Sequence, residues 1–493
     1  MRARAAAAAA GLLGAALARA APPSFEVRAG PRAEVLAVEA RFTEPFEGPL
    51  VLADGGERFV RDVQIESAGG WKTIAGRESG LDVPGCARGC RVRYRFLLRE
   101  AAEALGDPEA AAAFSGSYVA PPSSWLLHSA SQSVAGYQLR VTVPEGIQFL
   151  SGLSRSPGLE ANTFRVTGAG LRVAPMCAFG AWRVRVLDVG GAHLTIGIAP
   201  VTFAMSDPEI EGWIQEAVAA VAAYYRGFPV KDLLVLVAPS RGGRLGGVTL
   251  GEGGASVLLR LGTAMPARVA RSHWVLTHEL MHLGFPSLLR RHIWMEEGMA
   301  VFGEPIVRVR AGMVDEDELW SEWLEQGAIG LPRPGEGGLE ETHTWARTYW
   351  GGALFWLVAD VTLRERTANA RSVDDVLRAL VAAGGNVNVR WTVEDVLRVA
   401  DAAAGIPVIS ELFRTMAEAP GAPDLPALWK RLGIALDGDR VVYDDRAPLA
   451  AVRRAMAGHP PAEVPKDFSH GSPSAVPATP PDDRPAHGTP TSR

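Results

Sequence analysis

Residues 277–283 read Thr-His-Glu-Leu-Met-His-Leu, and the rest of the chain can be interpreted around this stretch. On an α-helix, positions i and i+4 lie on one face, one turn apart. His278 and His282 therefore present two imidazoles to a single metal ion, while Glu279 stands beside that ion. The pattern predicts a zinc site in which one helix supplies two ligands and a general base.

The residues around the two histidines are apolar, which makes this short motif more informative. Val275, Leu276, Leu280, Met281 and Leu283 predict a helix that is buried on most sides. Two imidazoles and a carboxylate cost free energy in such a place unless they have partners. A metal ion supplies the partner. The alternative is a pair of core histidines satisfied by other protein groups.

A catalytic zinc has three protein ligands and one open position, so the third ligand must come from a nearby segment. Residues 294–300 read Trp-Met-Glu-Glu-Gly-Met-Ala and are expected on a second helix, from about residue 288 to about 303–305. Glu297 and Glu296 are both candidates. Adjacent helical residues point about 100° apart, so only one of them can face the metal.

Taken together, these two stretches resemble the gluzincin metallopeptidases, in which a glutamate of the second helix is the third zinc ligand. The resemblance implies that role for Glu297. Residues 349–354, Tyr-Trp-Gly-Gly-Ala-Leu, are similar to a segment of the same superfamily whose tyrosine stabilises the oxyanion, which implies that role for Tyr349. The order of motifs resembles the glycyl aminopeptidase family in particular, over residues 210 to 450. This family is related to the aminopeptidase N and thermolysin-like superfamily.

The chain departs from these families in three respects. The aminopeptidase N family binds the amino terminus of its substrate with a Gly-x-Met-Glu-Asn segment, where residues 246–254 here contain Glu252 as their one carboxylate. Gly351 stands where the family usually has a lysine, and no PDZ domain is found. The sequence predicts an exported zinc peptidase with one Zn²⁺ per chain. An aminopeptidase, an endopeptidase, a hydrolase of non-peptide amides and an inactive binding protein on the same scaffold are all left open.

The composition limits the classes of binding partner that the chain is expected to have. The length of 493 residues predicts two to four domains. The net charge of −5 and the 21% of charged residues are ordinary for a globular protein of this size. No basic run suggests a nucleic-acid partner. Beyond the N-terminus, no stretch reaches the roughly 18–20 apolar residues that span a bilayer. The expected partner is a peptide or protein substrate, and the oligomeric state is not predicted.

The N-terminus has the features of a secretory signal peptide. A basic start at residues 1–4 precedes an apolar run, and Ala-Arg-Ala at 18–20 fits the small-x-small cleavage pattern. A periplasmic or secreted protein is therefore expected, with an Ala-rich leader as the alternative. Cys86 and Cys90 lie close together among glycines and are predicted to form a disulfide, which suits that compartment. Cys177 is expected to be a small buried residue.

The expected fold class is α+β. Alternating polar and apolar residues predict a β-rich N-terminal domain, an antiparallel sandwich or a similar sheet, with a short helix near residues 100–114. The strands with the strongest alternation are at 91–96, 139–143, 182–186 and 193–196.

The pattern changes at Asp207-Pro208, which suits a helix start. A small sheet with strands at 233–237 and 256–261 precedes the metal helix, which is expected to begin near Pro266, and the C-terminal part is mostly helical. By resemblance, this catalytic domain is thermolysin-like. The expected division is a signal peptide (1–20), a β-rich domain (21–205), a catalytic domain with its helical continuation (206–420), a small module (421–458) and a disordered Pro-rich tail (459–493).

Overall fold

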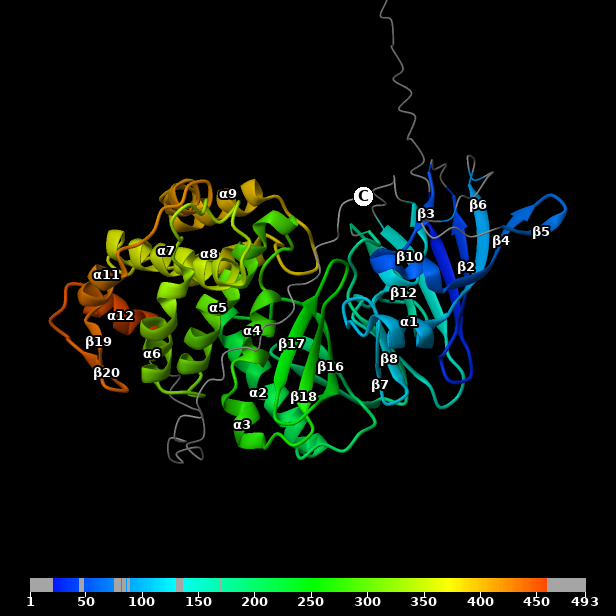
Figure 1. Ribbon diagram of the computed structural model, residues 1–493, viewed down its shortest axis with the longest axis horizontal. Coiled ribbons are helices and arrows are strands. Elements are labelled where there is room, and N and C mark those ends of the chain that lie inside the picture. Colours follow the sequence, from blue (N-terminus) through cyan, green and yellow to red (C-terminus); the bar gives the residue numbers. More distant parts are fainter. Residues whose placement is uncertain are drawn as a thin grey trace, which may run out of the picture.

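The computed structural model describes residues 21–43, 48–74, 81, 86, 89–129, 136–168 and 170–458. Figure 1 shows a β-rich domain in blue and cyan, a central sheet with helices in green, and a helical part in yellow and orange. The predicted α+β class, with a β-rich N-terminal domain and a mostly helical C-terminal part, is confirmed. The predicted signal peptide and Pro-rich tail lie outside the described residues.

The N-terminal domain contains two sheets that share one apolar core. The larger sheet has the order β12-β10-β1-β2-β6-β4-β5 and is antiparallel except where β1 pairs with β10. The smaller sheet has the order β11-β13-β8-β7. The bounds are β1 (Ser24–Ala29), β2 (Leu36–Phe42), β4 (Val60–Ser67), β5 (Gly70–Thr73), β6 (Cys90–Phe96), β7 (Ala112–Phe114), β8 (Ser117–Ala120), β10 (Gly136–Thr142), β11 (Gln148–Ser151), β12 (Thr163–Thr167) and β13 (Cys177–Gly180).

The predicted helix at 100–114 is too long. Helix α1 (Leu98–Leu105) ends at Gly106, which adopts the left-handed conformation that closes many helices, and Pro108 follows. Residues 107–111 form a turn, and β7 follows it. The predicted disulfide between Cys86 and Cys90 is confirmed, and Cys177 is buried as expected.

A five-stranded sheet in the order β14-β15-β16-β18-β17 supports the metal helix (Figure 1). Strands β15, β16 and β18 are parallel neighbours, whereas the edge strand β17 runs antiparallel to β18. Helix α2 (Asp207–Tyr225) makes the crossover from β15 to β16. The bounds are β14 (Arg183–Val189), β15 (Ala192–Ile198), β16 (Asp232–Ser240), β17 (Leu245–Leu250) and β18 (Ser256–Gly262).

Both faces of this sheet are covered, which explains the continuous apolar run in β16. Leu233, Val235 and Val237 belong to the core shared with the helices. Leu234 and Leu236 belong to a second core shared with the smaller N-terminal sheet. The sheet therefore lies between the helices of the site and the N-terminal domain.

The prediction that the strands at 182–186 and 193–196 belong to the N-terminal sheets is wrong. They form the hairpin β14–β15, and β15 pairs with β16 in parallel from His193–Asp232 to Ile198–Val237. Their alternation identified them correctly as strands. It carried no information on which sheet they join, because that depends on pairing with residues about 40 positions later.

The metal helix does not begin at Pro266. Helix α3 (Ala267–Ser272) ends at His273, whose backbone is extended, and α4 (Val275–His282) starts anew after Trp274. The backbone N–H of Val275 donates a hydrogen bond to Nδ1 of His273 at 3.3 Å, which satisfies one free donor of the new helix.

Helix α5 (Ile293–Arg310) begins later and ends later than the 288 to 303–305 predicted. Pro305 lies inside it, although proline removes one helical hydrogen bond. The residues after the proline, Ile306, Val307 and Val309, are buried, so packing carries the helix past it.

The C-terminal part is helical, as predicted. Its principal members are α6 (Glu316–Gln326), a π-helical turn (Arg347–Gly351), α7 (Gly352–Arg366), α8 (Val373–Ala382), α9 (Val393–Ala404) and α10 (Val408–Leu412). A small module follows with α11 (Leu425–Leu432), β19 (Ile434–Asp437), β20 (Arg440–Tyr443) and α12 (Ala450–Ala457). None of the helices within the described ranges is long and apolar enough to cross a membrane.

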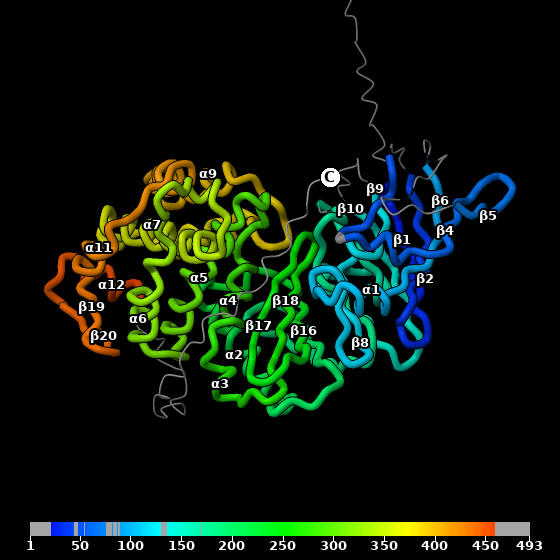
Figure 2. The backbone as a smooth tube through the Cα atoms, in the orientation of Figure 1, coloured from blue at the N-terminus to red at the C-terminus, as the bar shows by residue number. Residues whose placement is uncertain are grey.

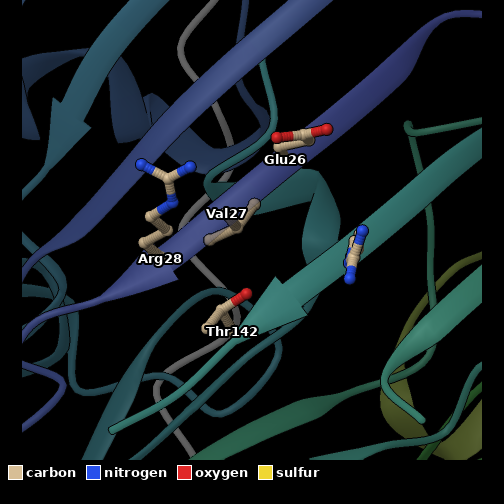
Figure 3. Close-up of a pocket in the computed structure, with 5 residues that line it drawn as sticks. Glu26, Val27, Arg28 and Thr142 are labelled. Atoms are coloured by element: carbon tan, nitrogen blue, oxygen red, sulfur yellow. The ribbon is translucent and has the colours of Figure 1, made fainter. Parts of the chain in front are cut away.

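A hollow of about 210 Å³ lies on the N-terminal domain, lined by residues of the paired strands β1 and β10 (Figure 3). It is lined by Glu26, Val27, Arg28, Arg140 and Thr142. None of these residues belongs to the predicted zinc site, which is built from α4, α5 and β17. In the tube view, α4 lies beside β17 at the centre of the molecule (Figure 2), and the two elements are in contact.

Candidate active site

His278, His282 and Glu297 converge between α4 and α5. Nε2 of His278 lies 3.3 Å from Nε2 of His282 and 3.3 Å from Oε2 of Glu297, and Nε2 of His282 lies 3.5 Å from the same oxygen. Within the part of the chain that the structure describes, these three residues are the one group of histidine, cysteine, aspartate or glutamate side chains that could hold a metal ion.

The two neighbouring glutamates of α5 have different environments. Glu297 faces the histidine pair, whereas Oε1 of Glu296 accepts a hydrogen bond from the backbone N–H of Leu288 at 3.0 Å. Burial raises the pKa of Glu296 to about 8. Burial also acts on Glu297, but His282 and His278 outweigh it and hold the pKa of that carboxyl far below its usual range. Glu297 is therefore ionised at neutral pH and can serve as a ligand.

The spacing of the three atoms fits a zinc ion. Two ligands at about 2.0–2.1 Å from zinc and at the tetrahedral angle lie about 3.4 Å apart. The three separations in the structure are 3.3, 3.3 and 3.5 Å. Two imidazole nitrogens and one carboxylate oxygen are also a ligand set that zinc prefers. The residues present therefore fit the metal that the sequence predicts.

Glu279 follows His278 on α4 and points about 100° away from it, toward β17. The hydroxyl of Thr249 contacts Oε2 of Glu279 at 2.7 Å and the Glu279 carbonyl oxygen at 3.0 Å. A Cβ atom on Gly247 would lie 2.7 Å from Oε1 of Glu279 and closer still to its Cγ, so only glycine leaves room for this side chain. Burial raises the pKa of Glu279, although His278 and His282 act against this. A buried carboxylate of raised pKa is suited to accept a proton.

Gly247 and Thr249 were not identified from the sequence as site residues. Residues 242–254 are rich in glycine, which is rare inside strands, so the sequence does not predict a strand there. A signal was nevertheless present, since glycine within a strand often marks a place where another group approaches the backbone closely. Gly247 and Thr249 are two apart and therefore share one face of β17.

Tyr349 lies in the π-helical turn, and its ring is parallel to that of His278 with centroids 6.3 Å apart. Wide turns of this kind are frequent at functional sites. Close backbone packing fixes the crossing of this segment with α5: a Cβ atom on Gly298 would lie 2.6 Å from the backbone nitrogen of Ala353 and closer still to Gly352. This contact sets the position of Tyr349 relative to Glu297.

The ring of His278 is held by aromatic neighbours. Trp274 meets it edge to face with centroids 5.3 Å apart, and Tyr349 covers it on another side. Nδ1 of His278 is buried and has no hydrogen-bond partner among the described residues. The orientation of this imidazole therefore depends on packing with Trp274 and Tyr349.

Three further histidines and the carboxylate of Glu252 are not part of the triad. Nδ1 of His292 pairs with Glu340 at 2.7 Å, His273 stacks on Trp274, and His343 is exposed. Glu252 is buried, and its Oε1 accepts hydrogen bonds from Nη2 and Nε of Arg390 at 2.5 and 3.0 Å. The one carboxylate of segment 246–254 is therefore already neutralised by an arginine.

Comparison with known proteins places the fold. No family profile matches the sequence, and no curated protein matches it. The chain is similar to the crystal structure of an aminopeptidase N family protein from Idiomarina loihiensis, with a TM-score of 0.60 and 14% identity over 84% of this chain and 78% of that chain.

It is also similar to an M1 zinc metallopeptidase from Deinococcus radiodurans, solved with a bound Tyr-Ser-Ala substrate. The TM-score is 0.53 and the identity 17%, over 82% of this chain and 95% of that chain. A third similar structure is a two-domain M1 zinc metallopeptidase bound to L-arginine. Its TM-score is 0.51 and its identity 16%, over 81% of this chain and 94% of that chain. The predicted gluzincin aminopeptidase-like fold is therefore confirmed.

Proposed function

We propose that the protein is a zinc-dependent peptidase, with one Zn²⁺ held by His278, His282 and Glu297. The observation that carries this proposal is the triangle of ligand atoms 3.3, 3.3 and 3.5 Å apart, with Glu279 next to it on the same helix. When bound, zinc would act as a Lewis acid and lower the pKa of a water molecule to about 7.

Glu279 is the general base in this proposal. Its carboxylate accepts the proton of the attacking water and then delivers it to the leaving amine. Contact with Thr249 and the space left by Gly247 fix the carboxylate in place, and burial keeps its proton affinity high.

Tyr349 donates a hydrogen bond to the oxygen that becomes negatively charged as the carbonyl is attacked. Such a donor contributes about 3–4 kcal/mol to catalysis. An extended peptide substrate fits beside β17, because this strand is at the edge of its sheet and pairs only with β18 among the described strands.

The pairing of Glu252 with Arg390 bears on the choice between exopeptidase and endopeptidase. An aminopeptidase needs a carboxylate that is available to bind the ammonium group of its substrate. The only carboxylate of segment 246–254 is buried and already bound to arginine. This observation supports an endopeptidase, which we keep as a second candidate function beside an aminopeptidase. A binding protein without catalysis would not need the arrangement around Glu279.

Two measurements test the proposal. Zinc content of the mature protein is expected to be one ion per chain. Cleavage is then compared on matched peptides with free and acetylated amino termini. Hydrolysis of free peptides alone assigns an aminopeptidase, hydrolysis of both assigns an endopeptidase, and stoichiometric zinc without cleavage of any peptide would contradict the proposed function.

We also propose that the protein is exported to the periplasm or secreted. The features of residues 1–20 support this, as does the disulfide between Cys86 and Cys90, a bond typical of oxidising compartments. Fractionation of cells that express the full chain, with detection of the shortened N-terminus, tests it. Retention of an intact N-terminus in the cytoplasm would contradict it.

A further inference from the structure

Exposed tryptophans gather at the candidate site. All thirteen tryptophans of the chain are among the described residues, and only Trp274 and Trp345 are exposed. Tryptophan is ordinarily well buried, so exposure of this side chain calls for an explanation. Both exposed indoles contact site residues: Trp274 lies 5.3 Å from the ring of His278, and Trp345 lies 5.6 Å from the ring of Tyr349.

These four rings form a continuous series, Trp274, His278, Tyr349 and Trp345, which we call the aromatic row. His278 and Tyr349 occupy its centre, with centroids 6.3 Å apart, and the two indoles occupy its ends. The ends come from separate segments, since Trp274 precedes α4 and Trp345 lies one turn before Tyr349. The row therefore contains one member of the zinc triad, His278, and is exposed to solvent at both of its ends.

Each indole stacks against one neighbouring ring. Trp274 stacks against His273 with ring planes 27° apart, and Trp345 stacks against Tyr349 at 24°. The side chains nevertheless remain 43% and 51% exposed. Each indole therefore keeps aromatic surface on which another flat, apolar group can stack.

We propose that Trp274 and Trp345 are the walls of two specificity subsites, and that the preferred substrates carry an aromatic side chain next to the scissile bond. This inference rests on the proposed peptidase function. The scissile bond must lie at the centre of the row, near the triad and Tyr349. The side chains before and after it then fall toward the exposed ends, where an indole offers stacking.

A peptide panel tests the inference. The peptides are blocked and unblocked at the amino terminus and differ only in the residue on either side of one bond, which is Phe, Leu, Ala or Arg. Arginine is included because a cation can also bind to an indole face. For the wild type, kcat/KM is measured for each peptide. For Glu279→Gln, the dissociation constants are measured by calorimetry.

Three variants locate the subsites: Trp345→Ala, Trp274→Ala and the matched control Trp71→Ala, which removes a half-buried indole from β5 on the N-terminal domain. The wild type is expected to prefer Phe over Ala by about tenfold on at least one side of the bond. Trp345→Ala should lower this preference about tenfold on one side, and Trp71→Ala should leave it unchanged. Zinc content is measured for Trp274→Ala, because this indole also holds the ring of His278.

The possible results separate the two proposals. Equal binding and equal cleavage of the Phe, Leu, Ala and Arg peptides would overturn the subsites while the peptidase function stands. A preference for Arg over Phe would also overturn them. Tryptophan-dependent binding of Phe peptides without cleavage of any peptide would support the subsites and overturn the peptidase function.

Discussion

Gly247 and Glu279 are in direct contact between the edge strand β17 and the metal helix α4. The strand backbone approaches Glu279 so closely that a Cβ atom at position 247 would lie 2.7 Å from Oε1 of the carboxylate. Two residues further along the strand, the hydroxyl of Thr249 donates a hydrogen bond to the other carboxylate oxygen, Oε2. The proposed base is thus positioned by a strand whose own sequence carries no titratable group.

Gly247→Ala is therefore expected to impair catalysis without removing the metal. The added methyl group displaces the carboxylate of Glu279, and a misplacement of about 1 Å can lower kcat about 100-fold. Kinetics and zinc content measure the two effects. Gly246→Ala is the matched control, because a Cβ atom there would lie 3.5 Å from Arg260, an ordinary contact. Equal kcat for the two variants would show that this contact does not position the base.

Glu297→Gln is expected to weaken zinc binding more than Glu296→Gln does. Loss of groups that only support a ligand costs about 10–100-fold in metal affinity, and loss of an ionised ligand should cost at least as much. Competition with a chelator measures the affinity. Glu296 accepts a hydrogen bond from Leu288 and is not part of the ligand group, so its amide variant should retain zinc. Retention of zinc by Glu297→Gln alone would contradict the ligand assignment.

Tyr349→Phe is expected to lower kcat about 100- to 1,000-fold with little change in KM, since the hydroxyl acts on charge that develops in the transition state. The ring remains, so its stacking with His278 and Trp345 is kept. Tyr443→Phe, in the distant strand β20, is the control for loss of a tyrosine hydroxyl. An unchanged kcat for Tyr349→Phe would remove this residue from the mechanism.

A buried ionic cluster joins helices α5, α7 and α8. Asp374 of α8 pairs with Arg310 of α5 at 2.6 Å and with Arg364 of α7 at 3.6 Å. Burial alone would raise the pKa of Asp374, but these arginines outweigh it and hold the pKa below its usual value. Because the pKa is lowered in the folded state, the stability this group contributes is present above about pH 4 and is lost as the pH falls further.

Asp374→Asn is therefore expected to lower the free energy of unfolding by about 3–5 kcal/mol at pH 7, because it takes the ionised carboxylate away from Arg310, while Arg364 keeps its pair with Asp360. The difference from the wild type should shrink as the pH falls below about 4. Unfolding by urea at several pH values measures it. The exposed pair of Arg366 and Glu411 serves as the control, and Glu411→Gln should cost less than about 1 kcal/mol. A difference for Asp374→Asn that does not depend on pH would contradict the assigned pKa shift.

The parts of the site that depend on local spacing were predictable from the sequence. His278, Glu279 and His282 lie within one helical turn and a half, and their geometry follows from the helix itself. The choice of Glu297 over Glu296 needed the resemblance to gluzincins, because the rotation of α5 depends on its packing. The structure places Glu297 next to the histidines through the contact of Gly298 with Gly352.

The parts that depend on distant contacts were not predictable. The pairing of β15 with β16, the support of Glu279 by β17 and the neutralisation of Glu252 by Arg390 join residues from 30 to 138 positions apart. Local propensity does not report such pairings, and a glycine-rich strand has little strand propensity of its own. The continuation of α5 through Pro305 also depends on packing. The break at His273 has a local cause, the hydrogen bond from Val275 to the His273 ring.

The central claim is that Glu279 moves the proton beside a zinc ion held by His278, His282 and Glu297. The most direct test is the kcat of zinc-replete Glu279→Gln on a peptide that the wild type cleaves, with zinc content measured on the same samples. The account predicts one zinc per chain in both proteins and a kcat lowered about 100- to 10,000-fold in the variant. Equal cleavage by the two proteins, or absence of zinc from the metal-replete wild type, would contradict it.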